Sequence, residues 1–186
     1  MLTPKYNTII KFNQMKLHII LYHPEIPQNT GNIARTCVGF NATLHLIRPY
    51  GFVLSDKLVK RSGVDYWKHL KLVQHDCYED FLKTIKKNAQ IYYITRYGKK
   101  QLENIKFNAK NKDKEIYLMF GAESTGIDKK ILIKNKNNTI RIPRSKNVRS
   151  LNLSNCVAIC AYQVLRLDKF KDLEKFEPHK LNYLDN

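Results

Sequence analysis

The fold is decided by residues 17–47, LHIILYHPEIPQNTGNIARTCVGFNATLHLI. Leu17–Tyr22 is a short run with high β propensity, and Pro24 ends it because proline cannot donate to a strand ladder. Thr43–Ile47 has the same strand character. Apolar residues between the two runs recur at helical spacing, namely Ile33, Cys37 and Phe40. The chain is therefore predicted to open as strand, helix and strand, with Asn29 or Thr30 capping the helix.

The same alternation continues to the end of the chain. Helices are predicted over Asp76–Lys87, Asp128–Lys134 and Leu153–Asp168, and strands over Ile91–Thr95, Glu115–Phe120 and Thr139–Ile142. Alternating strands and helices indicate a single α/β domain, with a mostly parallel sheet covered by helices on both faces. Only Lys99–Lys114 and Leu167–Asn186 are interpreted as polar connector or tail. Ligands of such sheets bind beyond the carboxyl ends of the strands.

The length of 186 residues corresponds to one compact domain. The chain has 33 Lys and Arg against 16 Asp and Glu, a formal net charge of +17. This excess favours a polyanionic partner, with nucleic acid first. Because 25 of the cations are lysine and asparagine occurs 17 times, a compositional bias of the genome could also explain it.

No run has the roughly 18 apolar residues needed to span a bilayer, and Met1–Gln14 has no secretory apolar core. We therefore expect a cytoplasmic protein that does not contact a membrane. The cysteines are Cys37, Cys77, Cys156 and Cys160, with no Cys-x-x-Cys pair. Free thiols are favoured over a disulfide or a zinc site.

Asn32 and Arg35 stand three residues apart on the first predicted helix, opposite its apolar stripe. A cation near a helix N-terminus is poorly placed for stability, because the helix dipole favours anions there. Arg35 is therefore a candidate to hold a phosphate or a reacting hydroxyl. The alternative is an arginine that hydrogen-bonds a neighbouring loop.

Gly121 and Gly126 have the spacing of a phosphate-binding P-loop, but Ile127 and Asp128 replace its Lys and Ser/Thr. No dinucleotide-binding glycine fingerprint occurs either, so a nucleotide-dependent dehydrogenase or an NTPase is disfavoured. Glycine lets a ligand approach this backbone closely, and Glu123 offers a carboxylate beside it. A tight turn with an exposed Glu123 is the alternative.

A stretch without acidic residues runs from Lys129 to Arg149 and contains eight cations. Ser150, Asn152 and Ser154 follow it and could cap the last helix. A basic loop beside a helix N-terminus suits a phosphate backbone, although it could also be a solvated charged loop.

In this order, the three segments resemble the SPOUT superfamily of RNA methyltransferases, whose AdoMet domain forms a trefoil knot. The match covers about Leu17 to Leu167, nearly the whole domain. It is carried by residues 22–35 (YHPEIPQNTGNIAR), 118–127 (LMFGAESTGI), 140–143 (IRIP) and 150–155 (SLNLSN). Within the superfamily the chain is most similar to the tRNA (cytidine/uridine) 2′-O-methyltransferases that act on the wobble nucleotide of the anticodon.

This resemblance implies a C-terminal deep trefoil knot, S-adenosyl-L-methionine as methyl donor and no metal. It implies that AdoMet is bound by Ile94, Gly121, Ile142, Ser150 and Leu151. Arg35 matches the family's catalytic arginine, and Asn32, Glu123 and Asn152 match its supporting polar positions. The domain is expected over residues 17–168. The family typically starts almost at its first strand, whereas here a basic extension covers 1–16, and the tail at 169–186, which contains four lysines and is expected to be basic, is longer than in the family.

The reaction would move a methyl group from the AdoMet sulfonium to a ribose 2′-oxygen. The family assigns Arg35 the role of general base, yet an arginine side chain stays protonated at physiological pH. We prefer Arg35 as a stabiliser of the developing alkoxide that also holds the adjoining phosphate. The proton then leaves to phosphate, to water or transiently to the guanidine.

Candidate RNA contacts are Arg144, Lys146, Arg149 and Tyr162, although Tyr162 could instead be a core or dimer-interface residue. The last helix carries more apolar positions than one face needs (Val157, Ile159, Cys160, Val164 and Leu165), which predicts a homodimer, as in the family. Alternative functions are 2′-O-methylation of another tRNA or rRNA nucleotide and non-catalytic RNA binding by the same fold.

Overall fold

The computed structural model describes residues 15–53, 65–86, 89–107, 115–171 and 173–178. The α-helices are α1 Pro27–Gly39, α3 Tyr78–Thr84, α4 Lys129–Lys134 and α5 Leu153–Leu167. The strands are β1 Lys16–Tyr22, β2 Thr43–Ile47, β3 Lys71–His75, β4 Gln90–Ile94, β5 Lys100–Gln101, β6 Glu115–Phe120 and β7 Thr139–Arg141. Three short 3₁₀ helices are η1 Asp65–His69, η2 Leu102–Asn104 and η3 Lys136–Asn138.

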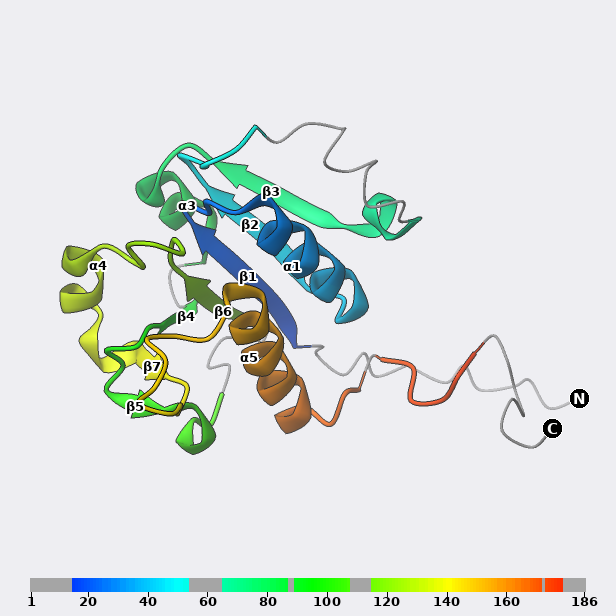
Figure 1. Ribbon diagram of the computed structural model, residues 1–186. Helices are drawn as coiled ribbons and strands as arrows, with labels where there is room; N and C mark the ends of the chain where they lie inside the picture. Colours follow the sequence, from blue (N-terminus) through cyan, green and yellow to red (C-terminus); the bar gives the residue numbers. More distant parts are fainter. Residues whose placement is uncertain (1–14, 54–64, 87–88, 108–114, 172, 179–186) are drawn as a thin grey trace, which may run out of the picture.

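One sheet joins the seven strands in the order β3-β2-β1-β6-β4-β7-β5 (Figure 1). Every strand pair in it is parallel. The predicted single α/β domain with a mostly parallel sheet is therefore confirmed. Because the strands run in one direction, their carboxyl ends share one edge of the sheet.

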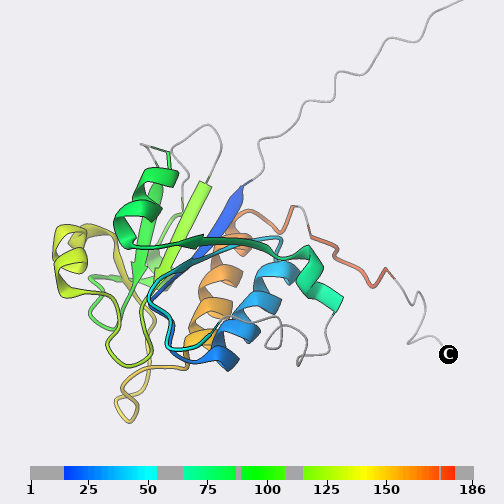
Figure 2. The ribbon, with the colours of Figure 1, turned by 90° about the horizontal axis from the view of Figure 1, so that it is seen from above.

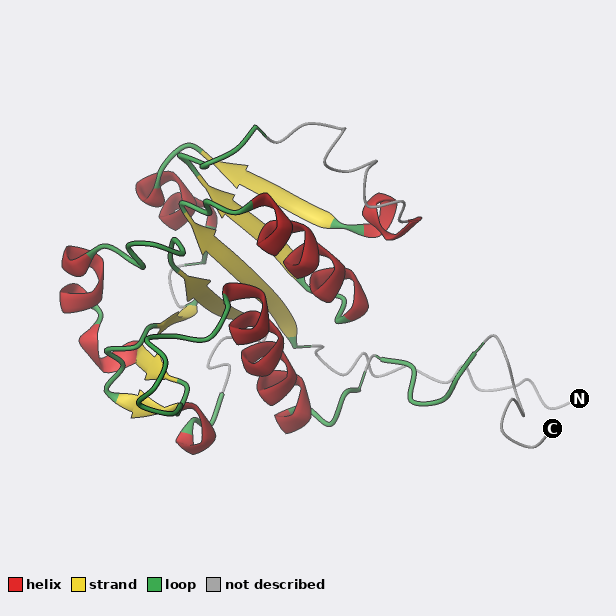
Figure 3. Ribbon diagram, viewed as in Figure 1, coloured by secondary structure: helices red, strands yellow, loops and turns green. Residues whose placement is uncertain are grey.

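Helices cover both faces of the sheet, as the buried pattern of its central strands requires (Figures 2 and 3). All six residues of β6 are buried. On one face α1 and α5 lie side by side and enclose a core that includes Ile33, Cys37 and Val157. On the other face Phe81 of α3 and Ile131 of α4 pack over the sheet.

Helix α1 starts earlier than predicted. Its N-cap is Ile26, with Pro27 in the first turn, and Asn29 and Thr30 are buried inside the helix, so their predicted capping role is wrong. Proline is favoured at this position because the first helical N–H groups have no partner within the helix. Helix α3 is shorter than the predicted 76–87, since Asp76 and Cys77 precede it and it ends at Thr84.

Two strands were not predicted, and both lie at sheet edges. Strand β3 exposes most of its side chains, so its sequence KLVQH has no clear apolar alternation. Strand β5 falls in Lys99–Lys114, for which the interpretation as a polar connector is wrong in part. After β5 this segment buries three apolar side chains in the core, namely Leu102, Ile105 and Phe107.

The cysteines are free thiols, with Cys37 and Cys160 buried and Cys77 and Cys156 partly buried. Burial raises the pKa of Cys37 to about 12, so this thiol stays protonated and inert. In the described part of the chain, no helix has the length and apolar character needed to cross a membrane.

Candidate active site

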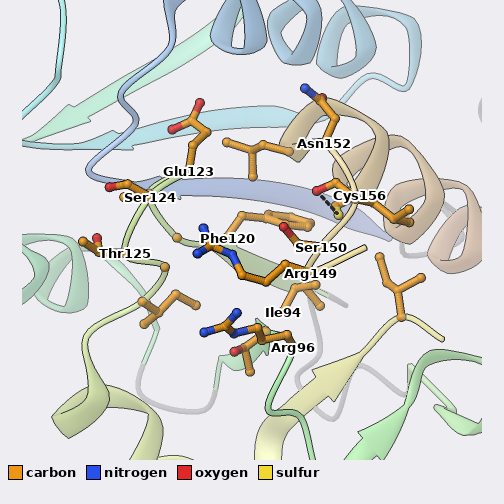
Figure 4. Close-up of a pocket in the computed structure, with 18 of the residues that line it drawn as sticks. Ile94, Arg96, Phe120, Glu123, Ser124, Thr125, Arg149, Ser150, Asn152 and Cys156 are labelled. Atoms are coloured by element: carbon orange, nitrogen blue, oxygen red, sulfur yellow. Dashed lines mark hydrogen bonds between the residues drawn. The ribbon is translucent and has the colours of Figure 1, made fainter. Parts of the chain in front are cut away.

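A cavity of about 370 Å³ lies at the carboxyl ends of β4, β6 and β7. Three segments line most of it: 94–97 after β4, 120–127 after β6, and parts of 142–156 after β7 (Figure 4). It includes all five residues expected to hold the methyl donor, namely Ile94, Gly121, Ile142, Ser150 and Leu151. Residues separated by more than 50 positions in the sequence thus meet where a parallel sheet places ligands.

The loop after β6 is closed tightly by its two glycines. A Cβ at Gly121 would lie 2.1 Å from the carbonyl carbon of Gly126. Gly126 has a φ of +75°, and its N–H donates to the carbonyl of Ala122 at 2.8 Å. Only glycine permits this approach and this conformation without strain, so the two glycines shape the cavity wall.

Glu123 joins this loop to the start of α1. Its carboxylate accepts from the backbone N–H groups of Glu25 at 2.9 Å and Ile26 at 3.3 Å, and from Nδ2 of Asn29 at 2.9 Å. A carboxylate at a helix N-terminus also interacts favourably with the helix dipole. Glu123 thus anchors the turn that leads into α1.

The Glu25 carboxylate makes the reciprocal contact with the loop after β6. Its carboxylate accepts from the backbone N–H of Ser124 at 2.8 Å and from the Ser124 hydroxyl at 2.5 Å. The two carboxylates therefore fasten residues 25–29 to residues 123–124 in both directions. This pair of contacts was missed in the sequence because the partners lie almost 100 residues apart.

Asn152 connects the same network to α5. Its Oδ1 accepts from the backbone N–H of Ser154 at 2.8 Å and caps α5, and its Nδ2 donates to Oδ1 of Asn29 at 3.0 Å. The supporting positions Glu123 and Asn152 therefore meet at Asn29. Asn29 is buried and lines the cavity, but the sequence pattern did not identify it.

The cavity has apolar walls and cations around it. Phe120 and Ile94 are buried, and Ile142 and Leu151 are partly buried. The guanidinium groups of Arg96, Arg144 and Arg149 belong to the lining, and Nε of Arg144 donates to the carbonyl of Arg149 at 2.8 Å. Such a site suits a molecule with an apolar ring and an anionic group. Arg96 and the adjacent Tyr97 were missed, although their position directly after a strand could have indicated them.

The other predicted residues lie outside this cavity. Asn32 and Arg35 are exposed on α1, and the Arg35 guanidinium carbon lies 5.9 Å from the centre of the Tyr66 ring. Lys146 is exposed in the basic loop, and Tyr162 is 52% exposed on α5. Within one chain, the structure does not bring Arg35 together with the five cavity residues.

No group of three or more His, Cys, Asp or Glu side chains that could hold a metal ion occurs among the described residues.

The parallel α/β sheet, with a cavity formed by three loops at its carboxyl edge, agrees with the fold expected for the class of SPOUT methyltransferases. The model of the SpoU rRNA Methylase family matches residues 16–162. The chain belongs to this family.

A relative from Geobacillus stearothermophilus is 45% identical over 159 residues, which are 86% of this chain and 99% of the relative. That protein carries the provisional name tRNA (cytidine(34)-2′-O)-methyltransferase. A solved structure described as giving insights into 2-OH methylation of C/U34 on tRNA is 39% identical. It has a TM-score of 0.76, covering 84% of this chain and 99% of its own.

A structure of an AdoMet-bound rRNA methyltransferase from Sinorhizobium meliloti has a TM-score of 0.70 at 21% identity. It covers 83% of this chain and 57% of its own, and shares the fold.

Proposed function

We propose that this protein transfers a methyl group from AdoMet to the ribose 2′-oxygen of the wobble nucleotide, cytidine or uridine 34, in a tRNA anticodon loop. The observation that carries the proposal is the convergence of Ile94, Gly121, Ile142, Ser150 and Leu151 on one cavity. The choice of tRNA and of nucleotide 34 is supported by the names of the relatives.

The lining of the cavity fits AdoMet chemically. Ile94, Phe120 and Ile142 offer apolar surface to an adenine ring, and the backbone near Gly121 is accessible for hydrogen bonds. Arg96 and Arg149 supply cations suited to a carboxylate. When bound, AdoMet supplies a methyl group already activated by its sulfonium, and no metal is required.

Arg35 has the electrostatic role in this proposal. Its guanidinium stabilises the negative charge that develops on the 2′-oxygen and holds the adjoining phosphate. The methyl–oxygen bond forms as the sulfonium–methyl bond breaks, and the hydroxyl proton leaves to phosphate or water. Asn32 lies one turn earlier on the exposed side of α1, where it can orient the same ribose.

We also propose a homodimer, in which Arg35 of one chain serves the cavity of its partner. Four of the five apolar α5 residues noted in the sequence are buried within the chain, and only Ile159 is exposed. Ile159, Tyr162 and Pro143 line a shallow, mostly apolar depression that a second copy would cover. Sedimentation at micromolar concentration is expected to give a dimer, and a monomer would contradict this arrangement.

The trefoil knot is a further part of the proposal. Segments 94–97, 120–127 and 142–153 surround one cavity, and the N–H of Thr95 donates to the carbonyl of Ile140 at 2.9 Å. These three segments would surround one cavity in this way if residues 142–153 passed through the loop formed by residues 95–120. A crystal structure in which residues 142–153 pass outside the loop of residues 95–120 would contradict the knot.

We propose domain bounds of 17–168, with a basic extension at 1–16 and a tail at 169–186. The tail was expected to be basic, but its four lysines are matched by four acidic residues. We also propose action in the cytoplasm, where the tRNA substrate is met. The family match over 16–162 supports the bounds. Residues 1–14 and 179–186 lie outside the described residues. Arg144, Lys146 and Arg149 are proposed as RNA contacts, for which the exposure of Lys146 is favourable. Tyr162, the fourth RNA candidate from the sequence, lies in the depression that the second copy would cover, so in this proposal it belongs to the dimer interface.

Replacement of Arg35 tests the mechanism. Arg35→Ala is expected to lower the transfer of labelled methyl groups from AdoMet to tRNA by at least about a hundredfold, the scale of one lost oxyanion donor. AdoMet should still raise the melting temperature of the variant as in wild type, since Arg35 lies outside the cavity lining. A folded Arg35→Ala protein that no longer binds AdoMet would refute this division of roles.

A further inference from the structure

A second cleft, of about 860 Å³, adjoins the AdoMet cavity. The two share part of their lining, which includes Thr95, Tyr97 and the Thr125–Ile127 segment. The second cleft extends from this wall toward α4, η3 and the end of β1. None of the residues found only in this cleft is used by the methyl-transfer site described above.

The cleft contains three cations contributed by separate elements. Lys99 precedes β5, Lys129 begins α4 and Lys136 begins η3, and all three are exposed. The acidic residue in the lining is Asp128, whose carboxylate accepts from the backbone N–H of Lys130 at 2.6 Å as the cap of α4. The cleft therefore presents a positive surface beside the proposed reaction centre.

Aromatic rings accompany these cations. Tyr97 is 66% exposed and belongs to both linings, and the Arg96 guanidinium carbon lies 4.7 Å from the centre of its ring. At the other end, the rings of Tyr22 and His23 stack with centres 3.7 Å apart. His23 has a φ of +54°, a conformation that turns the chain directly after β1. Burial lowers the pKa of His23, which favours a neutral ring at pH 7.

Lysines that can reach phosphates, combined with exposed aromatic faces, are the combination that binds single-stranded nucleic acid. We propose that this cleft binds the nucleotides that flank the methylated ribose, with phosphates on Lys99, Lys129 and Lys136 and a base stacked on Tyr97. This inference rests on the proposed function, because the shared wall at Tyr97 lets one RNA strand pass from the reaction centre into the cleft.

Helices α4 and η3 supply a matched pair of variants. Lys129→Ala/Lys136→Ala removes two cations from the cleft, whereas Lys130→Ala/Lys134→Ala removes two exposed cations of α4 that do not line it. The net charge changes equally in both. The affinity of each variant and of the wild-type protein for an anticodon stem-loop RNA is measured at several salt concentrations.

The cleft variant is expected to bind the RNA about tenfold more weakly, and its log–log salt slope should be shallower by about 1.4, the value for two single-strand phosphate contacts. The control variant should keep wild-type affinity within about twofold, and AdoMet affinity should be unchanged in both variants. Equal losses in the two variants, or a loss of AdoMet binding in the cleft variant alone, would overturn the proposal.

Binding and methylation are read separately in this experiment. RNA that binds the wild-type protein but receives no methyl group would refute the proposed function, while the comparison of the two variants would still test the cleft. Tyr97→Phe should keep RNA affinity and Tyr97→Ala should lower it. Equal affinities of these two variants would contradict stacking on Tyr97.

Discussion

Gly121 is the residue at which the cavity is least tolerant of change. A methyl group there would lie 2.1 Å from the backbone of Gly126 and 2.2 Å from the N of Ile127, so the loop itself would have to move. Since both glycines shape the wall of the AdoMet cavity, a shift of the loop changes the cavity more than it changes the core.

Gly121→Ala is expected to weaken AdoMet binding at least about tenfold, or about 1.4 kcal/mol, while the protein stays folded. The matched control is Gly31→Ala in α1, where an added Cβ meets nothing within 4 Å. Because glycine is unfavourable inside a helix, the control should be about 0.5–1 kcal/mol more stable than wild type. Calorimetric titration with AdoMet measures the first effect, and equal affinities of wild type and Gly121→Ala would contradict this account.

Three neighbouring strands carry a row of histidines. Nδ1 of His18 on β1 lies 2.9 Å from Nε2 of His45 on β2, and Nδ1 of His45 lies 3.0 Å from Nε2 of His75 on β3. Each hydrogen bond needs one donor and one acceptor nitrogen, which neutral rings provide. Burial is the largest cause that lowers the pKa of all three rings. The pKa falls to about 4 for His18 and to about 3 for His45, and it is also lowered for His75.

This row makes the stability of the sheet sensitive to acid. The unfolded chain takes up protons on His18 and His45 near pH 6.5, and the folded chain takes them up only near pH 4 and below. Their contribution is therefore complete above pH 6.5 and is lost as the pH falls toward 4. For His45 alone, the free energy of unfolding should drop by about 2 kcal/mol between pH 7.5 and pH 5.

Urea unfolding at pH 7.5 and at pH 5 measures this drop in the free energy of unfolding. His45→Gln keeps a donor and an acceptor but cannot titrate, so the drop should be smaller than in wild type. His69→Gln, at an exposed position on η1, is the control and should leave the drop unchanged. An unchanged drop in His45→Gln would show that the histidine row does not titrate as described.

Elements with clear apolar patterns were predicted well, and the exceptions have physical reasons. Strands β1, β2, β4 and β6 are largely buried, so their sequences are apolar runs. The edge strand β3 lacks that pattern because it is mostly exposed. The contacts that anchor the start of α1 could not be read locally, because they come from Glu123, on a loop almost 100 residues later.

In the active site too, some residues could be predicted from the sequence, whereas others depend on contacts between distant segments. The five residues expected to hold the methyl donor were predicted from the family resemblance, and the parallel sheet brings them together at its carboxyl edge. The contact between Glu25 and Ser124 was missed because it depends on which loops meet in space, whereas Arg96 and Tyr97 were missed although their position after β4 could have indicated them. The separation of Arg35 from the cavity is likewise a property of the folded chain and supports the proposed dimer.

For the whole molecule, the net charge of +17 now has a more definite location. Arg96, Arg144 and Arg149 line the AdoMet cavity, and Lys99, Lys129 and Lys136 line the adjoining cleft. The carboxyl edge of the sheet therefore carries the cavity together with cations suited to phosphates. The charge supports association with RNA in general, whereas the choice of nucleotide depends on the site as a whole.

Methylation of the wobble ribose is tested by mapping the methylated product. The wild-type protein is incubated with labelled AdoMet and total tRNA, and the modified tRNA is digested with nuclease and analysed by mass spectrometry. The account predicts a single added methyl group on the 2′-oxygen of cytidine or uridine 34. A methyl group on a base or at another nucleotide, or no transfer by a protein that binds both AdoMet and tRNA, would contradict it.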